Sequence, residues 1–286
     1  MKKIKYFFEF IFVIILFFIF KIIGFKLSSN LGSCIGGFLG PLFRSKENIL
    51  SNIKKALPNI SDQDRKKINV EMWKNYGRIL SEYVFIKKFR NSKLNNFISV
   101  EGQEILSKIK ETNEPVVFIS GHFSNFELMA MHLEKSGIKL AAIYRPLNNF
   151  FLNKIMERIR KKYICKNQIK KGRTGTRELL SAFKNNYSIA LMIDQRVSEG
   201  IKSEFFGHNA FTTTIPGQLF KKFGCQIVPV YIERKEKFFF KIKISEPIIY
   251  KKNTSIEEIT IDLNKRLEKM ILLNPNQWIW SHNRWK

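Results

Sequence analysis

The apolar run that opens this chain constrains its fold more than any other feature. Residues 6–25 are broken only by Glu9, Lys21 and Gly24, and three lysines lie within the first five residues. A membrane-spanning helix needs about 20 mostly apolar residues. A secretory signal peptide shares the basic start and the apolar centre, but no small-x-small cleavage site closes this run. We therefore expect a retained membrane anchor over residues 1–43, which either spans the membrane or only dips into it.

The second half of this anchor has an unusual spacing of glycines. Gly32, Gly36 and Gly40 lie four residues apart within the apolar segment Leu31–Phe43. Small residues at this spacing let helices approach closely. The segment is therefore either a second membrane helix packed on the first, or a glycine-weakened amphipathic part of the folded domain.

Residues 44–96 are predicted to be helical. A basic amphipathic helix should run from Ser45 to Leu57 and stop at Pro58. Ser61 followed by Asp64 resembles a capping box, which starts a longer helix that ends near Phe85. The apolar side expected for this second helix consists of Val70, Trp73, Tyr76, Leu80 and Val84.

Residues 97–286 alternate between strand-like and helix-like patterns, and we expect residues 44–286 to form one folded unit. The expected strands are short, continuous apolar runs at Val116–Ser120, Leu140–Tyr144, Ile189–Ile193 and Gln226–Ile232. The expected helices are Gln103–Lys110, Phe126–Ser136, Asn149–Lys162, Arg173–Asn185, Pro216–Phe223 and Ser255–Leu273. Phe238–Ile244 alternates with lysines and is predicted to be an edge strand. This order predicts an α/β fold with a mostly parallel sheet flanked by helices.

The charge of the chain indicates anionic partners. Lysine and arginine exceed aspartate and glutamate by 50 − 24 = 26 residues, and they are spread along the whole chain. Such a field attracts nucleic acid, anionic lipid or an acidic protein. A non-enzymatic nucleic-acid-binding protein is one alternative, although the basic residues belong to no recognised binding module. The three cysteines are scattered, which argues against a disulfide framework and indicates a reducing compartment.

The segment from Val116 to Glu127 combines a buried strand, a break at Ser120 and Gly121, and the start of a helix. It places His122 and Glu127 at a strand-to-helix turn, where open α/β sheets bind their ligands. A neutral histidine there can take the proton of a hydroxyl as that oxygen attacks an acyl carbonyl. Glu127 is expected to hold the other ring nitrogen and stabilise the imidazolium. A hydrolase that activates water with the same pair is an alternative.

Polar groups also follow two other predicted strands. Arg145 comes after one of them, and Asp194, Gln195 and Arg196 come after the other. In a parallel sheet all of these side chains leave from the same edge as His122. Arg145 could bind a phosphate bidentately, and Asp194 could orient a base or an arginine. We predict that these four residues, together with Asn125 in the turn, bind substrate.

Several common site motifs are absent from the sequence. It has no Gly-x-Ser-x-Gly elbow, no Gly-x-Gly-x-x-Gly after a strand and no phosphate-binding Gly-Lys-Ser/Thr motif. It also lacks His-Glu-x-x-His and Cys-x-x-Cys, so we do not expect a catalytic zinc.

Taken in order, these segments resemble the late acyltransferases of lipid A biosynthesis. The resemblance covers nearly the whole length, from the anchor to the tail that carries Trp278, Trp280 and Trp285. It includes the segments Gly121–Glu127, Tyr144-Arg145-Pro146, Asp194-Gln195 and Phe205-Phe206-Gly207. The signature of the family is a histidine and an acidic residue separated by four positions, which here are His122 and Glu127. The family often has glycine where this chain has Ser124 and tryptophan where it has Phe126.

The resemblance implies transfer of a fatty acyl group from acyl carrier protein to a hydroxyl of a Kdo-bearing lipid A precursor. It also implies a glycerol-phosphate-acyltransferase-like core on the cytoplasmic side of the bacterial inner membrane. Both implied substrates are anionic, in keeping with the net charge of +26. The implied reaction needs neither a metal nor a redox cofactor, with the acyl carrier protein thioester as co-substrate. An acyltransferase that acts on a lysophospholipid or another glycolipid is an alternative, because an acceptor pocket is defined by its shape rather than by a motif.

Overall fold

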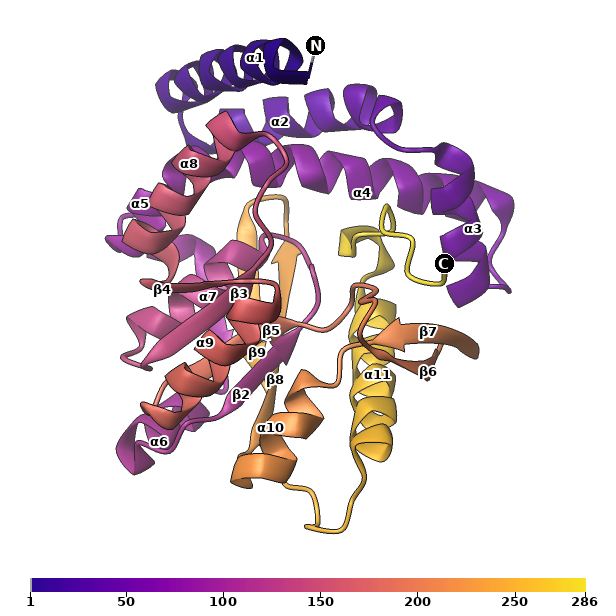
Figure 1. Ribbon diagram of the computed structural model, residues 1–286. Helices are drawn as coiled ribbons and strands as arrows, with labels where there is room; N and C mark the ends of the chain where they lie inside the picture. Colours follow the sequence, from indigo (N-terminus) through magenta and orange to yellow (C-terminus); the bar gives the residue numbers. More distant parts are fainter. Residues whose placement is uncertain (1) are drawn as a thin grey trace.

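A seven-stranded, mostly parallel sheet organises the computed structural model, which describes residues 2–286 (Figure 1). Across the sheet the strands are β1 (Ile98–Glu101), β9 (Phe239–Ile244), β8 (Ile227–Lys235), β2 (Val117–Ser120), β5 (Ser188–Met192), β3 (Leu140–Tyr144) and β4 (Asn167–Lys170). Neighbouring strands are parallel except β8 and β9. The strands β6 (Ile201–Phe205) and β7 (His208–Thr212) form a separate antiparallel hairpin. The predicted α/β fold class is confirmed.

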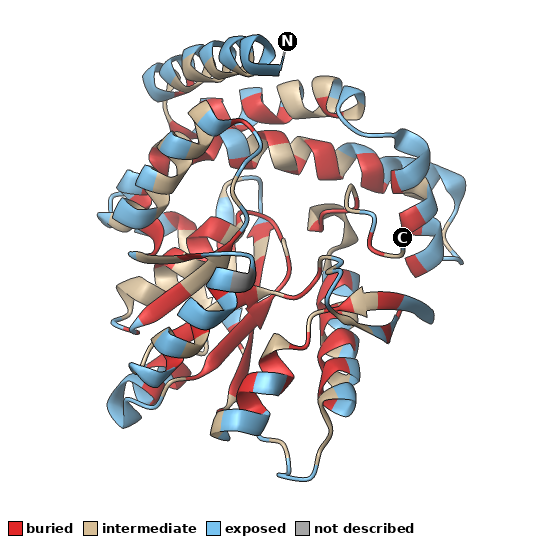
Figure 2. Cartoon of the chain, in the orientation of Figure 1, coloured by how far each residue is buried: buried red, intermediate tan, exposed pale blue. Residues whose placement is uncertain are grey.

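Helices alternate with these strands and cover the sheet. They are α6 (Gln103–Thr112), α7 (Phe126–Lys135), α8 (Phe150–Ile159), α9 (Arg173–Lys184), α10 (Ile215–Phe223) and α11 (Ile256–Leu273). The crossover from β2 to β3 and the crossover from β4 to β5 run in opposite directions across the sheet. Because such crossovers are right-handed, α7 and α9 lie on opposite faces. The central strands are buried between them (Figure 2).

One strand prediction was wrong, and some strands were missed. Phe239–Ile244 is not an edge strand, because β1 pairs with its outer side. Glu101 of β1 forms ion pairs with Lys241 and Lys243, which accounts for the lysines that suggested an edge. The sequence reading also missed β1, β4 and the β6–β7 hairpin, which are short and carry polar residues.

The N-terminal part of the described chain is helical and lies across one end of the sheet. Its helices are α1 (Lys2–Ile23), α2 (Phe25–Leu39), α3 (Lys46–Ala56), α4 (Asp62–Glu82) and α5 (Ile86–Arg90). Gly24 separates α1 from α2 with a φ of 83°, a left-handed conformation that glycine adopts without strain. By length and composition α1 could cross a membrane, with a mean hydropathy of 2.5.

The glycine-spaced helix α2 packs tightly along α4 and also contacts α1 (Figure 1). A side-chain carbon on Gly77 of α4 would overlap the carbonyl oxygen of Gly32, and one on Gly36 would overlap the carbonyl oxygen of Trp73. The small residues therefore serve a close helix–helix contact inside the folded domain. The segment packs on the folded domain as well as on α1, and its role at a membrane stays a prediction.

The predicted bounds of α4 are confirmed, but its predicted apolar side is only partly buried. Ser61 caps the helix by accepting a hydrogen bond from the backbone N–H of Asp64 at 3.0 Å. Trp73 is buried as expected, whereas Val70 and Leu80 are exposed. Because α2 covers the side that carries Gly77, the buried stripe is rotated away from these two residues.

The single acidic residue of α1 marks where this helix meets the α/β core. The side-chain amide of Asn149, just before α8, donates to the carbonyl oxygen of Tyr6 at 2.8 Å and to Glu9 at 3.2 Å. The Phe151 ring packs on the rings of Phe7 and Phe10. The rest of α1 exposes many large apolar side chains (Figure 2). A helix that exposes this many large apolar side chains is typical of a membrane-binding face.

Candidate active site

His122 and Asp194 meet at the carboxyl ends of two neighbouring parallel strands. Ser120 of β2 lies opposite Met192 of β5, so the residues two positions further along each strand also lie side by side. The imidazole Nδ1 of His122 is 2.8 Å from Asp194 Oδ1, and the backbone N–H of His122 donates to Asp194 Oδ2 at 2.8 Å. The carboxylate therefore fixes both the ring and the turn that carries it.

Asp194 is held as a buried carboxylate. Its side chain is 2% exposed, and the indole N–H of Trp278 donates to it at 2.9 Å. Burial alone would raise the pKa of Asp194, but the charge of His122 and the hydrogen bonds from His122 and Trp278 outweigh burial and lower this pKa to about 2. An ionised Asp194 accepts a hydrogen bond from Nδ1–H of His122, and in that tautomer of the imidazole Nε2 has a lone pair that can accept a proton.

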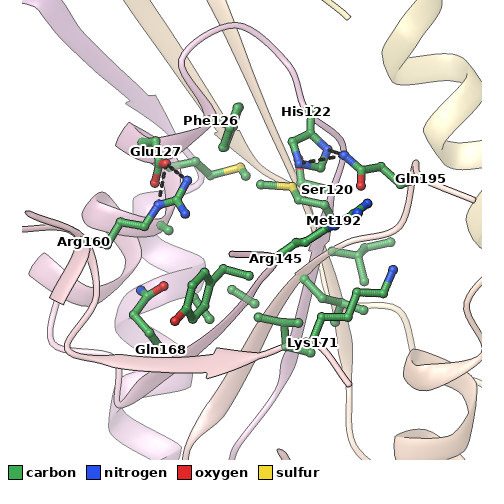
Figure 3. A pocket seen from close by; sticks show the side chains of 18 of the residues that line it. Ser120, His122, Phe126, Glu127, Arg145, Arg160, Gln168, Lys171, Met192 and Gln195 are labelled. Atoms are coloured by element: carbon green, nitrogen blue, oxygen red, sulfur yellow. Dashed lines mark hydrogen bonds and ion pairs between the residues drawn. The ribbon is translucent and has the colours of Figure 1, made fainter. Parts of the chain in front are cut away.

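The expected contact between His122 and Glu127 is not formed, and this part of the prediction was wrong. Glu127 instead accepts hydrogen bonds from the Nε (2.9 Å) and a terminal nitrogen of Arg160, which begins a π-helical turn (Arg160–Ile164) after α8. Figure 3 shows this pair at one side of the cavity and His122 with Gln195 at the other. The Phe126 ring, rather than Glu127, packs edge-on against the imidazole, with centroids 4.9 Å apart. A catalytic role for Glu127 stays a prediction.

The turn that carries His122 is held by residues distant in sequence. Ser124 has a φ of 42°, and its N–H donates to the carbonyl oxygen of Gln277 at 2.9 Å. The side-chain amide of Asn125 donates to Glu82 at 3.0 Å. Glu82 is fully buried and forms an ion pair with Arg234. Asn125 therefore links the turn to α4 and β8 rather than to a substrate.

A cavity of about 440 Å³ opens beside His122 at this edge of the sheet. Four predicted site residues line it, namely His122, Glu127, Arg145 and Gln195. The amide nitrogen of Gln195 lies 3.3 Å from Nε2 of His122. Apolar side chains line much of the remaining wall, including Phe118, Met129, Leu133, Ala142, Ile164 and Ala190. The cavity thus joins a general base to an apolar space that suits a hydrocarbon chain.

Three predicted substrate-binding residues do not line the cavity. Asn125 and Asp194 are buried behind the turn. Arg196 is exposed and lies 5.5 Å from the centre of the Phe211 ring. Asp194 takes the other role that its position suggested, which was to orient a base.

The sequence reading missed Arg44, Arg160, Lys171 and His282 as cavity residues. Arg44 follows the anchor, and His282 lies in the tail, so neither follows a strand. Arg160 lies in a stretch that was read as continuous helix. Lys171 directly follows β4, a strand that the apolar pattern did not reveal, and this strand exit was the one usable signal.

None of the three cysteines lines the cavity. Within residues 2–286 no group of three or more histidine, cysteine or acidic side chains gathers. Cys165 and Cys225 are buried, and burial raises the pKa of each thiol to about 12, which favours inert packing. The absence of a cofactor stays a prediction.

Comparison with known proteins identifies the family. The family model described as bacterial lipid A biosynthesis acyltransferase matches residues 1–286. The lipid A biosynthesis palmitoleoyltransferase of Escherichia coli is 26% identical over 262 residues, which cover 90% of this chain and 84% of that protein. The lauroyltransferase of the same organism is 23% identical over 243 residues, which cover 82% and 77% of the two chains.

Among solved structures, the 1-acyl-sn-glycerophosphate acyltransferase of Thermotoga maritima is 16% identical with a TM-score of 0.43, and the match covers 90% of this chain and 100% of that one. The family assignment comes from the sequence matches, which span the apolar helix, the turn at His122 and the tail alike. The chain therefore belongs to the bacterial lipid A biosynthesis acyltransferase family and is an acyltransferase.

Proposed function

We propose that this protein transfers a fatty acyl group from acyl carrier protein to a hydroxyl of a Kdo-bearing lipid A precursor, with His122 as general base. The observation that carries the proposal is the Asp194–His122 pair at the rim of a cavity with apolar walls, in a chain of this family. Asp194 sets the tautomer, and the cavity can hold the acyl chain out of water.

In the proposed reaction the acceptor hydroxyl replaces the Gln195 amide beside Nε2 of His122. Nε2 takes the hydroxyl proton while the oxygen attacks the thioester carbonyl. The new carbon–oxygen bond forms, the carbon–sulfur bond breaks, and the imidazolium returns its proton to the departing thiolate. Asp194 stabilises the imidazolium while it exists, because its carboxylate is buried and ionised.

Glu127 and Arg160 form the second polar group of the cavity, and we assign them to the substrate rather than to the imidazole. Glu127 is buried and Arg160 is mostly buried, and both side chains line the cavity. Burial alone would lower the pKa of Arg160, but Glu127 and Tyr83 together outweigh burial and raise it, so the guanidinium stays charged. A fixed cation and anion in a water-poor cavity can orient the polar end of a substrate whose acyl chain lies against the apolar wall.

The proposed setting is the cytoplasmic side of the bacterial inner membrane. The exposed apolar side chains of α1 and α2 would hold the cavity near the lipid acceptor. The net charge of +26 suits an acidic carrier protein and an anionic glycolipid. Neither partner requires a nucleic-acid-binding module.

The test is transfer of one labelled acyl chain. Membranes that contain the protein are incubated with acyl carrier protein thioester and a Kdo-linked lipid A precursor, and the lipid product is analysed. We expect one chain to be added, and we expect His122→Ala to reduce the rate by about 10²-fold or more, the size of a general-base contribution. His208→Ala is the matched control, because His208 is exposed on β7 outside the cavity.

Three results would contradict the proposal. Release of free fatty acid with no acylated lipid would point to a hydrolase. Transfer only to a lysophospholipid or to another glycolipid would change the acceptor. Equal rates for His122→Ala and His208→Ala would remove His122 from the mechanism.

A further inference from the structure

Three of the cationic side chains that the structure describes at the cavity form no ion pair. Arg44, Arg145 and Lys171 all line the cavity. Among the side chains that the structure describes, none of the three forms a salt bridge. Burial lowers the pKa of Lys171, and the nearby charge of Arg145 lowers it further, although the charge of Glu199 acts in the opposite direction. A cluster of this kind is stabilised when an anion binds between its members.

The tail adds His282 to this cluster and holds it firmly. The side-chain amide of Asn52 donates to the carbonyl oxygens of Trp280 at 2.9 Å and His282 at 2.8 Å. Two positions further along, the fully buried Arg284 donates to the carbonyl oxygen of Phe211 at 2.6 Å. The backbone is thus fixed on both sides of His282, whose ring lines the cavity 6.4 Å from the His122 ring, centroid to centroid.

His282 is not suited to act as a second base. Burial, followed by the charges of His122, Arg44 and Arg145, lowers the pKa of His282 to about 4, although Asp194 acts in the opposite direction. The ring is therefore neutral near pH 7 and offers one N–H donor beside the cations. A ring of this kind can donate a hydrogen bond to an anion.

We propose that Arg44 and His282, together with Arg145 and Lys171, form a subsite for a phosphate group on the headgroup of the acceptor lipid. The planar guanidinium of Arg44 would bind two phosphate oxygens, and the neutral His282 would donate to a third. The subsite would place the acceptor hydroxyl beside His122. This inference rests on the proposed function, which supplies an anionic glycolipid as acceptor.

The short distance to the base favours the acceptor as the source of the phosphate. The pantetheine arm of a carrier protein also carries a phosphate, but two amide units separate that phosphate from the thioester. A phosphate bound by His282 lies next to the reacting groups, since the two histidine rings are 6.4 Å apart. The donor phosphate could reach this position only if the arm folded back on itself.

The test is equilibrium binding by the full-length protein in detergent micelles. The probes are the phosphorylated lipid A precursor and the same glycolipid without phosphate. Arg44→Gln should weaken binding of the phosphorylated probe about tenfold, because it removes a charge-assisted hydrogen-bond donor. His282→Gln should cause a smaller loss. Neither variant should change binding of the dephosphorylated probe.

Matched variants separate charge from shape. Lys46→Gln removes an exposed cation two residues from Arg44 and outside the cavity lining, and it should leave binding unchanged. Arg44→Lys keeps the charge and should recover part of the affinity. Circular dichroism of each variant checks that the fold is retained.

The outcomes also separate this inference from the proposed function. Unchanged affinity in Arg44→Gln and His282→Gln, or equal weakening for both glycolipids, would overturn the subsite. Acylated phosphopantetheine and acyl-pantetheine serve as a second pair of probes. If the variants weaken binding only of acylated phosphopantetheine, the phosphate belongs to the donor and the acceptor assignment is overturned. Selective weakening in a protein that transfers no acyl chain would keep the subsite and reject the proposed reaction.

Discussion

At the residue scale, His122 takes its orientation from a carboxylate 72 positions away in sequence. A His and an acidic residue separated by four positions suggested a local pair, but the helix that begins at Phe126 carries Glu127 to the other side of the cavity. Two adjacent strand ends bring Asp194 to the imidazole instead. The site therefore contains two separate pairs, Asp194–His122 and Glu127–Arg160, rather than a His122–Glu127 pair.

This arrangement predicts that Asp194→Asn impairs transfer while the protein stays folded. An amide is close in size to a carboxylate, but it would favour the wrong tautomer of His122 and would not stabilise the imidazolium. We expect a rate loss of about 10²-fold or more, measured as acyl transfer under saturating substrate. Asp262→Asn is the matched control, since Asp262 accepts from Tyr250 and Arg266 and does not line the cavity. A rate near that of the control would show that Asp194 does not orient the base.

Asp194→Asn should also change how the stability of the protein depends on pH. The pKa of Asp194 is lowered from 3.8 to about 2, so its stabilising contribution is complete above pH 4 and is lost as pH falls from about 4 toward 2. Asp194→Asn should therefore flatten this part of the acid unfolding curve. An unchanged acid slope would mean that the carboxylate is not favoured by folding.

The sequence was sufficient to find His122 but not its partner or its surroundings. His122, Arg145 and Asp194 were found because each follows an apolar strand, and parallel strands end at one edge. The pairing of Asp194 with His122 depends on strand order, which no short pattern contains. Arg44 and His282 come from segments far apart in the sequence, and only tertiary packing brings them together.

At the element scale, the helix pair α2–α4 joins the apolar helix α1 to the core. Glycines on both helices let their backbones touch, and beside this contact Ser29 of α2 donates to the buried Glu82 of α4 at 2.7 Å. Glu82 also binds Asn125 of the turn at His122. A shift between the two helices would therefore reach the site.

Gly77→Ala tests this contact. The added carbon would overlap the backbone of Gly32, so the helices must separate, at a cost of about 1–3 kcal/mol or more that outweighs the gain of about 1 kcal/mol in helix propensity. We expect a lower apparent melting temperature in detergent micelles. Gly37→Ala is the control on α2, because its added carbon would meet only the flexible side chain of Lys74. Equal melting temperatures for the two variants would show that the close approach is not needed.

The elements themselves were largely predictable. Long helices and buried strands such as β2, β3 and β5 follow from clear apolar periodicity and turn residues. The missed strands β1 and β4 are four residues long, with two polar residues in β1 and three in β4, so their pairing depends on neighbours rather than on their own pattern. The buried face of α4 was misjudged for the same reason, because it was decided by where α2 packs.

At the scale of the whole molecule, the exposed apolar side chains and the charged cavity belong to one arrangement. The apolar face lies on α1 and α2, while Asn149 ties α1 to the start of α8 and the turn after α8 carries Arg160. The cavity is thus fixed relative to the surface that would meet lipid. A lipid acceptor could stay in the membrane while its headgroup enters the cavity.

The excess of 26 positive charges predicts that docking of the proposed carrier protein depends on salt. Attraction between a basic enzyme and an acidic carrier raises the association rate, and salt screens it. With limiting carrier-bound donor, we expect the transfer rate to fall about tenfold or more between about 0.05 M and about 0.5 M NaCl. An acylated phosphopantetheine without the protein is the matched donor. It carries little charge, so its transfer rate should fall much less as salt rises. Equal salt dependence for the two donors would place the effect on the lipid acceptor, and rates independent of salt would rule out electrostatic docking.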